Sequence, residues 1–287
     1  YEPVIKWSGS KRSQAKEILT YFPTEIGTYY EPFCGGAAVL RRLFNSNINV
    51  KHFFISDINK DLIELWKQIK NKPQDVANHY EELWNELNRD GDIERKKEYF
   101  VGVRERYNLE HNPLDFMFIM RTTTNGMPRY NQNGEFNNSF HITRNGIIPQ
   151  KLKNIICEWS ELLRLNNVEF ECCSYQDIIP TKGDYIYLDP PYANTKGMYF
   201  GVINYDDFWA WLKKVPCNYS FSFDGLSGVD NRTYIVPPYV YEKHVYILSG
   251  NSSFKRIIGK SKYSIVYESL YIKNGALKKD ENFKSSK

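Results

Sequence analysis

Residues 28–57 constrain the fold of this 287-residue chain more than any other stretch, because they alternate between strand and helix patterns. The tyrosine-rich segment 28–33 predicts a strand that ends in a glycine turn, and a short helix is expected to follow. A second predicted strand, 52–56, ends at Asp57. Consecutive strands joined by a helix run parallel, so this region predicts an α/β fold built on a mostly parallel sheet.

The pattern changes at Lys60, where apolar residues begin to recur at helical spacing. Helical periodicity continues through several segments, and Asn112 followed by Pro113 marks one helix start as N-cap and first-turn residue. A polar stretch rich in Asn and Gly, 125–145, predicts a long loop or hairpin. Residues 60–146 are therefore expected to form a mostly helical insertion.

The alternation of strands and helices resumes after residue 146. The expected elements, in order, are a helix over 150–163, strands over 168–172 and 185–188, a helix over 205–213 and a strand over 219–223. Two last strands, near 240–248 and 264–272, suggest an antiparallel hairpin at the sheet edge. We therefore expect residues 1–59 and 147–287 to build one α/β domain, which residues 60–146 interrupt.

Composition and cysteine usage narrow the class of protein. The chain has no run of 18 apolar residues, so no membrane span is expected, and its first residues lack the pattern of a secretory signal. The net charge of +4 permits a polyanionic partner, and the 16% of aromatic residues fits a surface that stacks on planar groups. The five cysteines form no CxxC pair or zinc-spaced cluster, so we expect reduced thiols, no metal site and a cytoplasmic location.

Candidate ligand groups follow the first two predicted strands. In an open α/β sheet, ligands bind at the carboxyl ends of the strands. Gly35 lets a ligand approach the backbone, and Asp57 comes 22 residues later, which is the spacing of an acid that binds ribose hydroxyls. The turn lacks the full GxGxxG pattern, which disfavours NAD. Taken alone, this pair is about equally compatible with a plain tight turn and a solvated strand-end Asp57.

The predicted strand over 185–188 ends in an Asp-Pro-Pro-Tyr motif at 189–192. Two consecutive prolines fix two φ angles and remove two N–H donors, so the Asp189 carboxylate and the Pro190 carbonyl can both face outward as acceptors. With the aromatic face of Tyr192 beside them, they suit a flat group that bears an NH2. A second Pro-Pro-Tyr, at 237–239, has no preceding acid, and we interpret that copy as structural.

Five motifs, in the same order along the chain, resemble those of the Dam-type (group alpha) adenine-N6 DNA methyltransferases. They are KWSGSK at 6–11, EPFCGG at 31–36, DIN at 57–59, NGMPRYN with GEFN at 125–137, and DPPY at 189–192. Each motif is short, but the combination covers nearly the whole chain. The resemblance implies a Rossmann-like methyltransferase sheet in the α/β domain, a target-recognition domain in the helical insertion, and a bacterial or phage enzyme associated with DNA.

The resemblance also assigns a cofactor, S-adenosyl-L-methionine, with S-adenosyl-L-homocysteine as its product. The matching cofactor positions are Trp7, Lys11, Phe33, Gly35, Asp57, Asp177 and Asp189. In the family's roles, Lys11 holds the cofactor carboxylate, Asp57 accepts from the ribose hydroxyls and Asp177 meets the adenine. Without the resemblance, Lys11 is better interpreted as a solvated lysine at a helix start, and Trp7 as a core residue. Ala37 departs from the family, which has glycine at that position.

The catalytic residues that the resemblance implies are Asp189, Pro190 and Tyr192. Adenine N6 is a poor nucleophile, because its lone pair is delocalised into the ring. If the Asp189 carboxylate and the Pro190 carbonyl accept both N6 hydrogens, the nitrogen moves toward tetrahedral geometry, and transfer is an in-line displacement that depends on positioning. The adenine must leave the duplex at a cost of a few kcal/mol, which stacking on Tyr192 offsets by roughly 1–3 kcal/mol.

The DNA-contacting positions that the resemblance implies are Asn125, Met127, Arg129, Asn131, Arg144, Lys255 and Arg256. Arg129 suits a guanine edge or a phosphate, Asn125 and Met127 wedge beside the flipped base, and Arg144 suits a phosphate. For Lys255 and Arg256 a solvated loop is nearly as well supported as a phosphate contact. The expected partner is double-stranded DNA, and a restriction endonuclease that acts on the same site is left open.

Two other functions stay open beside a site-specific adenine-N6 DNA methyltransferase. An RNA adenine or protein glutamine methyltransferase would share the fold, but those enzymes tend to carry Asn before the Pro-Pro-aromatic tripeptide, and they do not account for the Arg129 hairpin. An inactive DNA-binding protein would have kept the fold and lost the chemistry. The intact Asp189 and Tyr192 argue against that second alternative.

Overall fold

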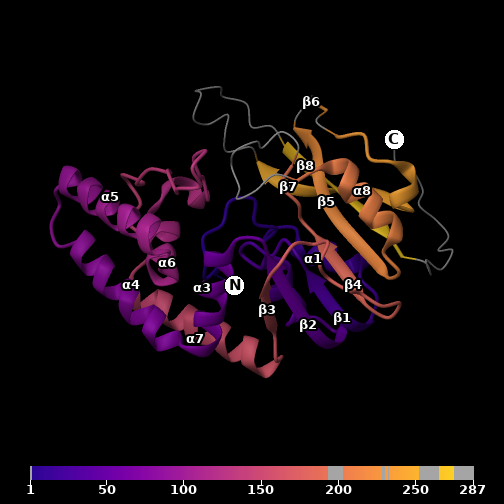
Figure 1. Cartoon of the computed structure of the whole chain (residues 1–287), viewed down its shortest axis with the longest axis horizontal. Helices are drawn as coiled ribbons and strands as arrows, with labels where there is room; N and C mark the ends of the chain where they lie inside the picture. The colour runs from indigo at the N-terminus through magenta and orange to yellow at the C-terminus, as the bar shows by residue number, and fades with distance from the viewer. Residues whose placement is uncertain (1, 193–202, 228–229, 232, 252–264, 275–287) are drawn as a thin grey trace.

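The fold is built on one mixed sheet (Figure 1). The computed structural model describes residues 2–192, 203–227, 230–231, 233–251 and 265–274. Among these residues the strands are β1 (Glu25–Glu31), β2 (Asn49–Asp57), β3 (Glu169–Cys172), β4 (Tyr185–Leu188), β5 (Asn218–Ser227), β6 (Asp230–Asn231), β7 (Lys243–Asn251) and β8 (Ile265–Lys273). Their order across the sheet is β3-β2-β1-β4-β5-β8-β7, and β6 pairs with β5.

The strands from β3 to β5 are all parallel, whereas β8 runs antiparallel to both β5 and β7. The predicted α/β sheet with an antiparallel edge hairpin is therefore confirmed, although the two-residue strand β6 was not predicted. The order 3-2-1-4-5 is that of a doubly wound sheet, whose connections reverse direction between β1 and β4. A crevice for a ligand is expected at the carboxyl ends of these two strands.

Strand β4 shows why the sheet is covered on both faces. Its four residues are buried, and the side chains alternate between two apolar cores. Tyr185 and Tyr187 enter the core that contains most of the helices, whereas Ile186 and Leu188 enter the core around α8 (Tyr205–Lys214). This period-two alternation is what a central parallel strand requires, and it delivers the next residue, Asp189, to the edge of the cavity described below.

The other helices are α1 (Ala15–Ile18), α2 (Ala38–Leu43), α3 (Lys60–Asn71), α4 (Pro73–Leu87), α5 (Ile93–Glu110), α6 (Pro113–Thr122) and α7 (Pro149–Leu165). Figure 1 shows α4, α5 and α6 at one end of the molecule and β5, β7 and β8 at the other. The segment 60–122 is thus almost entirely helical, as expected. Asn112 caps α6 by accepting from the Leu114 N–H at 2.9 Å, with Pro113 in the first turn. The division into two domains stays a prediction.

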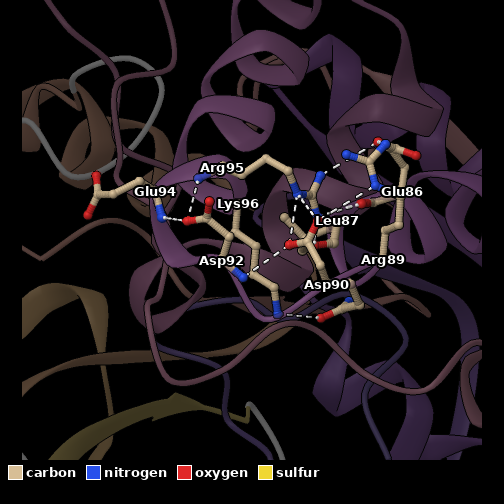
Figure 2. Close-up of polar contacts among 9 residues, drawn as sticks. Glu86, Leu87, Arg89, Asp90, Asp92, Glu94, Arg95 and Lys96 are labelled. Carbon is tan, nitrogen blue, oxygen red and sulfur yellow. Dashed lines mark hydrogen bonds and ion pairs between the residues drawn. The ribbon is translucent and has the colours of Figure 1, made fainter.

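The turn between α4 and α5 is held by a local polar network (Figure 2). Asp92 caps α5 by accepting from the backbone N–H groups of Glu94 and Arg95 at 3.0 and 3.3 Å. The Arg95 guanidinium donates to the carbonyls of Glu86 and Leu87, which are the last two residues of α4. These contacts satisfy backbone groups at the end of α4 and at the start of α5, and they join the two helix ends.

The polar stretch after α6 forms the predicted hairpin. Bridges join Thr123 to Phe140 and Tyr130 to Phe136. At the tip, the Asn131 side chain accepts from the Asn133 and Glu135 N–H groups, each at 2.9 Å, and donates to the Glu135 carboxylate at 2.7 Å. Next to this turn, the Asn59 side chain donates to the Tyr130 hydroxyl at 3.0 Å, which ties the hairpin to the start of α3.

Candidate active site at the carboxyl ends of the parallel strands

A cavity of about 300 Å³ lies at the carboxyl ends of β1, β2 and β4, where the order of the doubly wound sheet predicts a ligand. Sequence motifs that are far apart in the chain meet around it. The predicted cofactor and catalytic residues that line the cavity are Trp7, Lys11, Phe33, Gly35, Asp57, Asp189, Pro190 and Tyr192. The second Pro-Pro-Tyr, at 237–239, does not line it, and its Tyr239 side chain is exposed.

The turn after β1 requires glycine at position 35. Gly35 has a φ of +45°, and a Cβ atom there would come within 2.6 Å of the Trp7 indole nitrogen. The Gly35 carbonyl accepts from the Trp66 indole N–H at 3.0 Å, so the turn is fixed from both sides. Ala37 adopts a left-handed conformation, φ 50° and ψ 42°, directly before α2, where the family has glycine. An alanine therefore occupies a backbone conformation that favours glycine.

Asp57 lies at the end of β2 beside this turn. Its carboxylate accepts from the Asn59 N–H at 3.0 Å and from the Gly35 N–H at 3.3 Å. Burial raises the pKa of Asp57 to about 6, and the two backbone donors act against that rise. The predicted pair of Gly35 and Asp57 is thus in direct contact, with the acid facing the cavity.

A second acid, Glu31, lies deeper in the cavity wall, and the sequence analysis did not single it out. Its carboxylate accepts from the Tyr29 hydroxyl at 2.7 Å and from the Leu40 N–H in α2 at 3.1 Å. Burial raises the pKa of Glu31 to about 8, with a further contribution from the nearby Asp189. An acid inside the otherwise tyrosine-rich predicted strand 28–33 was the signal that could have identified it.

Asp189 is paired with Lys11. The Lys11 ammonium lies 2.8 Å from the Asp189 carboxylate, 3.4 Å from the Glu268 carboxylate and 2.9 Å from the Gly9 carbonyl. Only 4% of the Lys11 side chain is exposed, so this charge is held inside the site. The solvated-lysine alternative is therefore wrong. The predicted contact of Lys11 with a cofactor carboxylate stays a prediction.

Electrostatics in this cluster decides the charge on Asp189. Burial raises its pKa to about 6, Lys11 acts to lower it, and the Glu268 carboxylate acts to raise it. For Glu268 itself, burial acts to raise the pKa, but Lys11 and the hydrogen bonds that Glu268 accepts outweigh burial and hold the value below the ordinary one. At neutral pH both acids are therefore mainly ionised around one buried cation.

Tyr192 completes the cluster. Its hydroxyl donates to the Glu268 carboxylate at 2.7 Å, and the Lys11 ammonium lies 5.1 Å from the centre of its ring. Burial and the neighbouring carboxylates raise the pKa of the Tyr192 phenol well above its ordinary value, so it stays a neutral donor. The Tyr205 hydroxyl donates to the Pro191 carbonyl at 2.6 Å, which anchors the Pro-Pro segment to α8.

Asp177 is the one predicted cofactor residue that the structure does not bring to the cavity. Its side chain is exposed and accepts from the Ser174 N–H at 2.9 Å, which closes a local turn. The neighbouring Tyr175 lines the cavity instead and stacks on Phe33, with ring centroids 5.5 Å apart. The aromatic pair, rather than Asp177, therefore borders this part of the cavity.

Five of the predicted DNA-contacting residues are described, and they lie on or near the hairpin and do not line the cavity. Arg129, Asn125 and Arg144 are exposed, and Met127 is half-buried. Asn125 adopts a left-handed conformation, φ 59°, in the short turn after α6. The Asn131 side chain forms hydrogen bonds within the hairpin turn. A role in stabilising this turn is therefore an alternative to its predicted contact with DNA. Lys255 and Arg256 lie outside the described residues.

Comparison with known proteins agrees with this geometry. The model of the D12 class N6 adenine-specific DNA methyltransferase family matches residues 7–225. The Type II methyltransferase M.MjaIII of Methanocaldococcus jannaschii is 33% identical over 223 residues, which cover 71% of this chain and 74% of that protein. The Type II methyltransferase M.CviBI of Paramecium bursaria Chlorella virus NC1A is 30% identical over 197 residues, covering 67% and 69%. A DNA adenine methylase of Haemophilus influenzae is 27% identical over 199 residues, covering 67% and 64%.

The family match spans both the strand-end motifs and the hairpin, and it stops within β5. It therefore covers most of the chain and nearly every residue that lines the cavity, with Glu268 as the exception. Among the described residues, no helix is long and apolar enough to cross a bilayer. On the extent of this match, the chain belongs to the D12 class of N6 adenine-specific DNA methyltransferases.

Proposed function

We propose that this chain transfers a methyl group from S-adenosyl-L-methionine to N6 of an adenine that is flipped out of a specific site in double-stranded DNA. The observation that carries the proposal is the Asp189 carboxylate at the cavity rim, paired with buried Lys11 and flanked by the ring of Tyr192. Adenine-N6 transfer requires a charged acceptor next to a stacking surface, and this cluster supplies both.

The side chains that line the cavity fit the proposed cofactor. Asp57 offers a carboxylate of the kind that accepts from ribose hydroxyls, and the Phe33–Tyr175 pair offers an aromatic surface for an adenine ring. Trp7 and Lys11 line the same cavity and are our candidates for contacts with the methionine end. When bound, S-adenosyl-L-methionine supplies an electrophilic methyl group on a positively charged sulfur.

The residues of the Asp-Pro-Pro-Tyr motif would orient the adenine. The Asp189 carboxylate and the Pro190 carbonyl would accept the two N6 hydrogens, which makes the nitrogen lone pair available on the side of the cofactor. Lys11 favours the ionised form of Asp189, which is the form that accepts. Because burial raises the pKa of Asp189 to about 6, this carboxylate is also suited to take the proton that the nitrogen loses after methylation.

The helical segment and its hairpin would contact the DNA. Arg129 is exposed on the hairpin, and a guanidinium there can bind a guanine edge bidentately or a phosphate. We propose that residues 60–146 act as the target-recognition domain, while 1–59 and 147–287 carry the chemistry. The relatives named Type II methyltransferases also suggest a cognate restriction endonuclease for the same site, and such a pair would act in the cytoplasm.

The test is methylation of plasmid DNA by the purified protein with labelled S-adenosyl-L-methionine, followed by base-level detection of N6-methyladenine. We expect label at one short sequence motif, and none with Asp189→Ala. Asp75→Ala, which removes an exposed acid from α4, should methylate like the unaltered protein. Full activity of Asp189→Ala would refute the mechanism, and label in RNA or protein but not in DNA would refute the substrate.

A further inference from the structure

Glu268 is the one residue of the acidic cluster that lies beyond the family match and belongs to no motif of the sequence analysis. It lies on β8, and its side chain lines the same cavity as Asp189. One carboxylate oxygen, Oε2, accepts from the Tyr192 hydroxyl at 2.7 Å and lies 3.4 Å from the Lys11 ammonium. The other, Oε1, accepts from the Ser249 hydroxyl at 3.0 Å.

These contacts make Glu268 the junction between the stacking residue and the charged acceptor. An ammonium group has three N–H donors, and Lys11 directs them toward Asp189, Glu268 and the Gly9 carbonyl. The same Glu268 oxygen binds the hydroxyl at the far end of the Tyr192 ring. A movement of Glu268 would therefore alter both the tilt of the ring and the share of Lys11 that remains for Asp189.

The strand that carries Glu268 is suited to hold it still. β8 lies between β5 and β7 and is paired with both. Glu268 itself pairs with Ile247 of β7, and its two neighbours on β8 pair with β5 on either side of a bulge in that strand. Ser249, which donates to Glu268, belongs to β7, so the carboxylate is also held from the neighbouring strand. Sites built on such paired strands keep their geometry better than sites on loops.

We propose that Glu268 is a positioning residue for methyl transfer, which sets the orientation of Tyr192 and divides the Lys11 charge between itself and Asp189. The proposal rests on the proposed function. It predicts that loss of the Glu268 charge slows the chemical step while substrate binding changes little. It also predicts an altered acid limb of the pH profile, because a negative charge near Asp189 is removed.

The groups that face Asp189 determine the direction of that change. They are Lys11 from the N-terminal segment, Glu268 from β8, Glu31 from β1, Tyr187 from β4 and Tyr192 from its own motif. Glu268 acts to raise the pKa of Asp189, and Lys11 acts to lower it. Removing the Glu268 charge leaves Asp189 as the only carboxylate paired with Lys11 among the described contacts, so both effects shift the pKa of Asp189 downward.

The test compares Glu268→Gln with Glu242→Gln. The control removes the same charge from an exposed residue just before β7, on the same hairpin but away from the cavity. For Glu268→Gln we expect kcat to fall roughly 10- to 100-fold, as for a small misplacement of reacting groups, with KM for DNA and for the cofactor within about threefold. The acid limb of kcat/KM should move to lower pH. Glu242→Gln should change neither quantity.

Tyr192→Phe provides a second variant, because it keeps the ring and removes only the hydroxyl that binds Glu268. If Glu268 acts partly through this hydroxyl, Glu268→Gln should cost less in the Tyr192→Phe background than alone. Thermal melting checks that each variant is folded. An unchanged acid limb, or a loss of kcat that is fully additive with Tyr192→Phe, would overturn the inference. Lack of DNA methylation by the unaltered protein would overturn the proposed function instead.

Discussion

The Asp189→Asn variant should lose methylation activity and gain stability, and the pKa of Asp189 in the folded protein sets the size of the gain. Asp189 has an ordinary pKa of 3.8, which burial in the folded protein raises to about 6. A raised carboxyl pKa means that the folded state favours the protonated acid. Protonated Asp189 therefore contributes fully to the free energy of unfolding below pH 4, and this contribution is lost as the pH rises through 6. The difference corresponds to roughly 3 kcal/mol, an upper limit because 21% of the side chain is exposed.

An Asn side chain resembles the neutral acid and carries no charge to desolvate. The Asp189→Asn protein should therefore be up to about 3 kcal/mol more stable than the unaltered protein at pH 8, and the two should converge near pH 4. Methylation should fall at least about 100-fold, since a charged acceptor at the reacting group is lost. Stabilisation at the expense of activity is expected where a charged group is kept in a partly buried site for its chemistry.

Urea unfolding of both proteins at intervals from pH 4 to pH 8 measures this difference, provided that the denaturant slopes agree. The pH dependence of the stability difference matters more than any single value, because the higher stability of Asp189→Asn should develop between pH 4 and pH 6. A variant that is less stable than the unaltered protein at pH 8 would refute the reasoning. So would a stability difference that is the same at every pH, since it would show that the charge of Asp189 costs nothing in the fold.

Three further substitutions test other parts of the site. Gly35→Ala should lower the free energy of unfolding, measured in urea, by about 2 kcal/mol or more, because φ is positive and a Cβ would collide with Trp7. An unchanged urea midpoint would contradict the described turn. Tyr192→Ala should reduce turnover roughly 5- to 150-fold, because stacking on the adenine is lost. Tyr239→Ala, in the second Pro-Pro-Tyr, should leave steady-state rates unchanged. Equal losses in the two variants would refute the assignment of Tyr192 to the adenine pocket. Arg129→Ala should cost about 1–3 kcal/mol of discrimination between the methylated site and its single-base variants in competition assays, and retained specificity with retained affinity would exclude the hairpin as the reading element.

Much of the site could be predicted from the sequence because its motifs are local. The glycine turn, Asp57 and the Asp-Pro-Pro-Tyr motif each follow a predicted strand, and the carboxyl ends of neighbouring parallel strands meet at one sheet edge. The second Pro-Pro-Tyr, which lacks a preceding acid, does not line the cavity, and its structural role stays a prediction. Asp177 was assigned to the cofactor site by its position in a motif. In the structure its carboxylate accepts a hydrogen bond from the nearby Ser174 N–H instead of facing the cavity.

The residues that sequence analysis missed are those whose meaning depends on distant neighbours. Glu268 is one acid in an otherwise unremarkable strand, and it is 79 positions away from Asp189. Glu31 stands in a recognised motif, but only the packing of β1 against α2 shows that its carboxylate is buried. Neither burial nor a shared cation has a signature in the spacing of residues.

The sequence by itself determined the elements of this protein and the chemical groups at the strand ends, because periodicity and turn chemistry act over a few residues. Only the tertiary structure decided which of those groups share one environment. β8 enters the sheet antiparallel between β5 and β7, and this pairing brings Glu268 to Tyr192 and Lys11. Burial of Asp189, opposed by the neighbouring Lys11 ammonium, then sets the pKa of this carboxyl, and burial is a property of the packed molecule rather than of any segment.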